Sequence, residues 1–93
     1  MALQRQDISK AVLAVIQGWH FDAVITEDTN FDFDLPIDGK VKALYYYAIR
    51  IHLENQGYTF CNFKPQDCEQ AVKVGDIVEA VWDDLNPTSK QVM

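Results

Sequence analysis

The segment ITEDTNFDFDLPIDG, residues 25–39, is a long polar stretch without helical periodicity between two apolar helical patterns. We expect a loop from Phe21 to Asp38. A loop of this length is unusual in a small domain unless side chains anchor it. We therefore expect three aromatic rings to hold it across the neighbouring helices: Phe21, Phe31 and Phe33. The next helix begins at Gly39, with Asp38 as its N-cap, because a short carboxylate can accept from the free amides of a first turn.

Amphipathic helices are predicted on both sides of the chain's middle. From Asp7 to Trp19, apolar residues recur on one face at about 3.6 residues per turn. The segment from Val74 to Leu85 shows the same periodicity, and Asn86-Pro87 ends it. We expect these faces to supply the core, with these residues buried: Ile8, Val12, Trp19, Val78 and Val81.

The segment from Gly39 to Asn55 is predicted as a helix that is apolar around most of its circumference. Such a helix is buried on several sides or presents an apolar surface to a partner. Gly57 is expected to end it as a C′ glycine, and Pro65 to precede a short third helix over residues 66–71. Together the patterns predict an all-α fold with four helices. The helical domain would span residues 5–85, followed by a C-terminal tail over residues 86–93.

Two segments resemble the acyl carrier protein family, whose attachment region reads hydrophobic-Thr-x-x-x-x-Phe-x-x-Asp-Leu-x-x-Asp-Ser. Here the pattern is met by Ile25-Thr26, Phe31, Asp34-Leu35 and Asp38. The second segment, Val74-Gly-Asp-Ile-Val78, is similar to the start of the family's last helix. The resemblance covers residues 7–85. It implies an acyl-carrier-like four-helix bundle with a long loop between helices 1 and 2 and a short third helix.

Gly39 stands where the family carries its attachment serine. In the family, that hydroxyl holds a phosphopantetheine arm, on which the cargo is carried as a thioester. Glycine has no hydroxyl, and no serine or threonine lies between Thr29 and Thr59. Ser9 and Ser89 lie in the first helix and the tail. We therefore expect phosphopantetheine to be absent and the chain to have no cofactor, although Asp38-Gly39 also fits an ordinary helix start.

The predicted second helix is basic, whereas the chain as a whole carries a net charge of −6. Residues 38–53 hold three basic residues against Asp38 alone, a net of +2, so the rest of the chain carries −8. In the resembled family this helix is usually acidic, because basic patches on partner enzymes recognise it. The inverted charge should weaken docking to such enzymes.

Three consecutive tyrosines lie in the same helix. Successive helical residues point about 100° apart, so at most two can face one core and at least one should be exposed. Tyrosine is favoured at interfaces, but buried tyrosines with outward hydroxyls are also common. We expect a protein-docking face, for a partner or a second copy of the chain, formed by the following residues: Lys40, Lys42, Tyr45, Tyr46 and Tyr47.

Other classes of function find little support in the sequence. The acidic charge argues against a nucleic-acid partner, and no apolar run is long enough for a membrane span. The N-terminus lacks a signal peptide's apolar centre, so a cytoplasmic location is expected. No metal is expected at Cys61 and Cys68, or at the loop aspartates, whose spacing does not fit a calcium loop. Without a nucleophile motif or phosphate loop, an enzyme is not expected.

Three hypotheses for function remain open. The first is a non-catalytic, acyl-carrier-like interaction module that has lost its arm and acts beside fatty-acid, polyketide or peptide biosynthesis. The second is a working carrier in which only the usual serine has been lost. The third is a small acidic helical inhibitor or immunity-type protein that masks a basic partner with its carboxylates.

Overall fold

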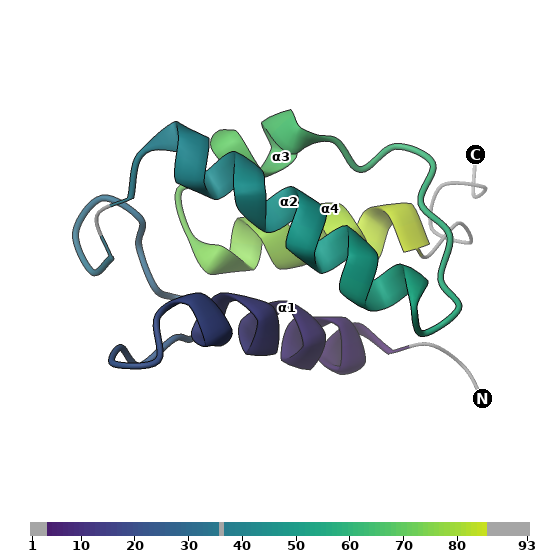
Figure 1. The fold of residues 1–93 in the computed structure, drawn as a ribbon, viewed down its shortest axis with the longest axis horizontal. Coiled ribbons are helices and arrows are strands. Elements are labelled where there is room, and N and C mark those ends of the chain that lie inside the picture. The colour runs from purple at the N-terminus through teal and green to yellow at the C-terminus, as the bar shows by residue number, and fades with distance from the viewer. Residues whose placement is uncertain (1–3, 36, 86–93) are drawn as a thin grey trace.

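A computed structural model describes residues 4–35 and 37–85, and the tail expected over residues 86–93 lies outside these ranges. Four helices follow one another along the chain: α1 Arg5–Trp19, α2 Gly39–Glu54, α3 Pro65–Glu69 and α4 Val74–Leu85 (Figure 1). The described residues contain no extended strand, only an isolated bridge between Asn30 and Lys73. The all-α prediction is confirmed, and the start and end of the last helix match the predicted residues.

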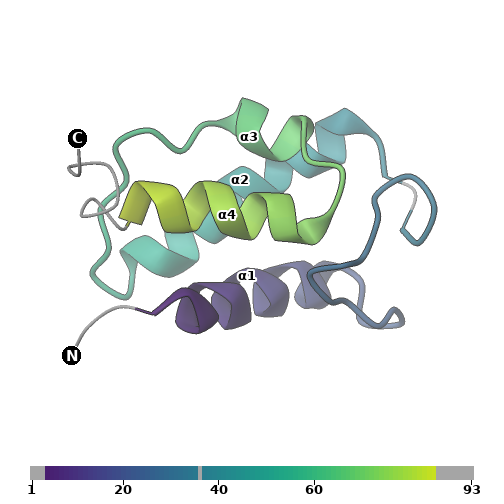
Figure 2. The ribbon, with the colours of Figure 1, turned by 180° about the vertical axis from the view of Figure 1, so that it is seen from behind.

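The helices enclose one core. Figure 1 shows α2 lying in front of α4, and the opposite view in Figure 2 looks onto α4. Both α2 and α4 pack against α1 and α3. The core receives one apolar face from each long helix, and its largest fully buried side chains include Ile8, Val12 and Ile16 of α1, Tyr45, Ile49 and Leu53 of α2, and Val74, Ile77, Val78 and Val81 of α4. No helix in the described ranges has the length and apolar character needed to cross a membrane.

Local signals in the sequence explain both ends of α2. The Asp38 carboxylate accepts a hydrogen bond from the backbone N–H of Val41 at 3.0 Å, which confirms it as the N-cap. At the other end, Gly57 has a φ of 99°, a left-handed conformation that favours glycine. Its N–H donates to the carbonyl of Glu54 at 3.0 Å, and the N–H of Tyr58 donates to Leu53 at 3.2 Å. This pair of bonds is the Schellman motif, with Gly57 as the predicted C′ residue.

The expectation that three aromatic rings anchor the long loop is wrong for two of them. Phe31 is buried, but Phe21 and Phe33 have more than four fifths of their surface exposed. Trp19, expected in the core, is 45% exposed, because α1 ends there and its ring lies over the edge of Tyr45 instead of entering the interior. Of the three rings, only that of Phe31 is therefore an anchor, and backbone hydrogen bonds also hold the loop.

Those hydrogen bonds join the loop to the start of α4. The N–H of Gly75 donates to the carbonyl of Glu27 at 2.9 Å, and that of Val74 donates to Thr29 at 3.0 Å. Phe31 donates in the opposite direction, to the carbonyl of Val72 at 2.9 Å. A Cβ placed on Gly75 would lie only 3.1 Å from the Glu27 carbonyl oxygen. The two segments that carry the family resemblance thus touch each other, and Gly75 allows their close approach.

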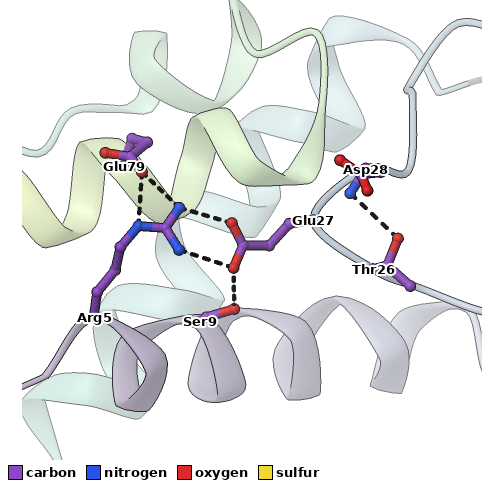
Figure 3. A network of polar contacts seen from close by, with 6 residues as sticks. All are labelled: Arg5, Ser9, Thr26, Glu27, Asp28 and Glu79. Carbon is purple, nitrogen blue, oxygen red and sulfur yellow. Dashed lines mark hydrogen bonds and ion pairs between the residues drawn. The ribbon is translucent and has the colours of Figure 1, made fainter.

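Figure 3 shows a polar network that fixes the same loop to α1 and α4. The Glu27 carboxylate accepts two hydrogen bonds from the Arg5 guanidinium, at 2.7 and 3.0 Å, and one from the Ser9 hydroxyl at 2.6 Å. Arg5 also donates to Glu79 of α4 at 2.7 Å. The Arg5 guanidinium, helped by the Ser9 hydroxyl, lowers the pKa of the Glu27 carboxyl below its usual value. The Arg5 guanidinium of α1 therefore bridges two carboxylates, Glu27 of the loop and Glu79 of α4.

A buried carboxylate, that of Asp84, organises the connection between α2 and α3. Position 84 lies on the buried face of α4, three residues after Val81, but an aspartate there gives no apolar signal in the sequence. Its oxygens accept from three successive backbone N–H groups, those of Cys61 at 2.9 Å, Asn62 at 2.9 Å and Phe63 at 3.1 Å. These bonds hold the Phe63 ring over the core, 4.9 Å from the ring of Tyr46.

Gly75 and Gly18 make a matched test of the contact between the loop and α4. Gly75→Ala should be less stable than Gly18→Ala by about 1–3 kcal/mol, because both variants gain helix propensity but only the methyl group at position 75 crowds the Glu27 carbonyl. Gly18 lies in α1 with nothing within 4 Å of an added Cβ. Gly18→Ala should therefore be neutral or stabilise by up to about 1 kcal/mol. Urea unfolding of the two variants measures the difference, and equal stabilities would contradict the close contact.

Candidate functional site

The position equivalent to the family's attachment serine lies at the exposed start of α2. Gly39 is the first residue of the helix and directly follows its cap, Asp38. An added Cβ at Gly39 would meet nothing within 4 Å. A serine would therefore fit there without a steric clash, so packing does not impose the glycine. Ser9 offers no replacement, because it is buried on α1 and its hydroxyl donates to Glu27.

Tyr45 is a core residue. Its side chain is fully buried, with its ring in edge contact with those of Trp19 (centroids 5.5 Å apart) and His20 (5.9 Å). The hydroxyl forms a hydrogen bond with Nε2 of His20. Burial raises the pKa of Tyr45 to about 12. This ring joins the end of α1 to α2 and to Phe31 of the loop, and it is not available to a partner.

Tyr46 is also buried, whereas Tyr47 is 54% exposed. The Tyr46 hydroxyl accepts a hydrogen bond from Arg50 at 2.7 Å, and its ring packs edge-on against Tyr47 at a centroid distance of 4.9 Å. Of three consecutive tyrosines, two therefore face inward and one faces outward, as helical geometry requires. Tyr47 is the tyrosine that can contact another molecule.

The basic residues of α2 differ in their freedom to bind a partner. The ammonium of Lys42 donates to the carbonyl of Ala71 at 3.0 Å and lies 5.5 Å from the centre of the Phe31 ring. Arg50 pairs with Glu54 at 3.0 Å. Lys40 is exposed and forms no ion pair with any described residue. Lys40 and Tyr47 are thus the exposed members of the expected docking set.

An exposed apolar stripe accompanies them. Leu44 is 47% exposed and Ile51 is 59% exposed, and both lie on the same side of α2 as Tyr47. We define the outer face of α2 as a set of five residues at the helix surface: Lys40, Leu44, Tyr47, Ile51 and Glu54. This stripe could not be recognised from the sequence, because α2 is also apolar on its buried side and no polar face separates the exposed apolar residues from the buried ones.

A second surface feature lies at the far end of α1. A pocket of about 310 Å³ is lined by residues 19–23 and Leu35. Two of these residues, Trp19 and Phe21, have exposed apolar side chains, as do Val24 and Phe33 of the same loop. Two polar groups, His20 and Asp22, line the pocket. Within the described ranges, no three His, Cys, Asp or Glu side chains lie close enough together to hold a metal ion.

The loop aspartates are partly committed to local structure. The Asp34 carboxylate accepts from the backbone N–H of Asn30 at 3.0 Å, and Asp38 caps α2. Asp28 and Asp32 remain exposed.

Comparison with known proteins identifies no relative of this chain. No protein-family model matches it, and no significant match exists among curated proteins or solved structures.

Alanine substitutions separate the core tyrosine from the outward one. Tyr45→Ala should reduce the free energy of unfolding by about 3–5 kcal/mol, because it removes a fully buried ring. Tyr47→Ala should change it by about 0.5–1 kcal/mol at most, since most of that side chain already faces solvent. Thermal or urea unfolding provides the measurement. A large loss of stability in Tyr47→Ala would show that this ring belongs to the core.

Proposed function

We propose that the chain is an acyl-carrier-like interaction module without a phosphopantetheine arm, which acts through protein contacts beside fatty-acid, polyketide or peptide biosynthesis. The observation that carries this proposal is the outer face of α2. An uncovered apolar stripe starts within two turns of the position where the resembled family is modified. In that family, the same helix is the one that partner enzymes recognise.

The composition of this face fits a protein contact. Leu44, Tyr47 and Ile51 bring apolar surface and an exposed aromatic ring, and tyrosine is one of the residue types enriched among interface anchors. Polar side chains flank the apolar residues, as at the rim of an interface. No serine, threonine or cysteine lies at Gly39 or along the rest of α2, so binding accounts for the face better than catalysis by such a nucleophile does.

The charge of the face indicates what kind of partner would dock. Lys42 donates to the Ala71 carbonyl and Arg50 pairs with Glu54, so Lys40 is the basic residue of α2 best placed to contact an acidic group of a partner. A partner surface that is apolar with an acidic group near Lys40 would be complementary. The alternative, an acidic inhibitor, would have to use carboxylates such as Asp28 and Asp32, because Asp34 and Asp38 hold the loop and cap α2.

Restoring the missing hydroxyl tests the carrier-like relationship. The wild type, incubated with a broad-specificity phosphopantetheinyl transferase and coenzyme A, should stay unmodified by intact mass. Gly39→Ser should accept the arm slowly, because a serine fits the open position but Lys40 beside it opposes the usual recognition. Gly39→Ser combined with Lys40→Glu should be modified faster. Gly39→Ala is the control that changes the same position without adding a hydroxyl.

Each outcome decides between the hypotheses. An arm on the wild type would show a working carrier that uses another residue. If neither serine variant is modified while both remain folded by circular dichroism, the carrier-like proposal is wrong. Equal rates for the two serine variants would show that Lys40 does not govern recognition.

A further inference from the structure

We infer that the outer face of α2 binds the same face of a second copy of this chain, with the two helices antiparallel around a two-fold axis at Tyr47. This inference rests on the proposed function in one respect, since it takes that face to be the docking surface. It adds the identity of an occupant and the geometry of the contact.

The first support is the spacing of the face. Its five residues, Lys40, Leu44, Tyr47, Ile51 and Glu54, follow one another at intervals of four, three, four and three. This alternation is the spacing of residues that form the seam between two paired helices. The three central residues are apolar or aromatic and about half exposed, so a seam is present on one side of α2 without a partner helix.

The second support is the symmetry of its charges. Lys40 and Glu54 each lie seven residues from Tyr47, one on either side. In an antiparallel pair centred on Tyr47, Lys40 faces Glu54 of the second copy, and the same contact occurs again across the axis. Leu44 then approaches Ile51 of the second copy. A parallel pair would instead place each charge beside an identical one, which is unfavourable.

The third support comes from the helix itself. Lys40 lies in the first turn of α2, which holds no acidic residue, and Glu54 is its last residue. Each charge stands at the end where the helix dipole disfavours it. An antiparallel second helix brings the opposite charge to both ends. Within one copy, Glu54 has Arg50 as a partner, whereas Lys40 has no carboxylate partner among the described residues.

The contact is small, because each copy contributes three apolar side chains along one helix. We therefore expect a weak dimer that forms as the protein concentration rises. Since the dimer covers the outer face of α2, self-association and the docking of another protein would exclude each other.

Charge reversal tests the pairing in solution. Sedimentation velocity over a wide concentration range should show the wild type dimerising. Lys40→Glu and Glu54→Lys should each weaken dimerisation by about tenfold or more, since each creates two like-charge contacts across the axis. The double variant K40E/E54K should regain most of the wild-type affinity. Circular dichroism checks that every variant is folded, because E54K also loses its pairing with Arg50.

Cross-linking tests the direction of the helices. In a Cys61→Ser background, which removes the exposed thiol, a short bismaleimide should link Tyr47→Cys to itself. Cys68 should not react, because it is buried and burial raises the pKa of its thiol to about 12. Leu44→Cys should link poorly to itself but efficiently to Ile51→Cys in a mixture of the two proteins. The control is Lys10→Cys, an exposed position on α1, which should not link.

The results separate this inference from the proposed function. A wild type that remains monomeric at all concentrations, or Leu44→Cys that links to itself as well as Tyr47→Cys does, would overturn the antiparallel dimer. Modification of Gly39→Ser by the transferase would leave the carrier-like function standing in that case. Conversely, dimerisation with rescue by K40E/E54K supports the inference even if Gly39→Ser is never modified.

Discussion

The close approach of Gly75 to the Glu27 carbonyl joins two segments that lie 48 residues apart and allows the long loop to cross the helices without a strand or helix of its own. Backbone hydrogen bonds through Thr29, Val74 and Phe31 continue this contact. The ion pairs of Arg5 with Glu27 and with Glu79 extend this contact to α1 and α4. The loop is fixed at α4, and it ends at Asp38, which caps the start of α2.

The position of α2 follows from this arrangement. Its inner side fills the core with Tyr45, Ile49 and Leu53, and Tyr46 packs on Phe63, which Asp84 holds in place through the backbone. No described residue covers the opposite side, where an apolar stripe remains exposed. An exposed apolar stripe on a small acidic protein favours association, and this is the physical basis for proposing a binding function.

The sequence predicted well what depends on neighbours along the chain. Helical periodicity located α1 and α4, the short carboxylate of Asp38 identified the start of α2, and Gly57 marked its end. It failed for side chains whose burial depends on distant partners. Phe21 and Phe33 are as apolar as Phe31, but only Phe31 lies where the loop meets Val72 and Tyr45. Among the candidate docking residues, the direction of each tyrosine and the engagement of Lys42 required the neighbouring elements to be known.

The central claim is that the outer face of α2 binds a second copy of the chain, and it can be tested without mutation. Amide and side-chain chemical shifts of isotope-labelled protein, followed by nuclear magnetic resonance in a concentration series, report which residues contact another copy. The account predicts changes at Lys40, Leu44, Tyr47, Ile51 and Glu54, with the core unchanged. Concentration-dependent changes confined to the pocket at the end of α1, or no changes on α2 at the highest concentration, would contradict it.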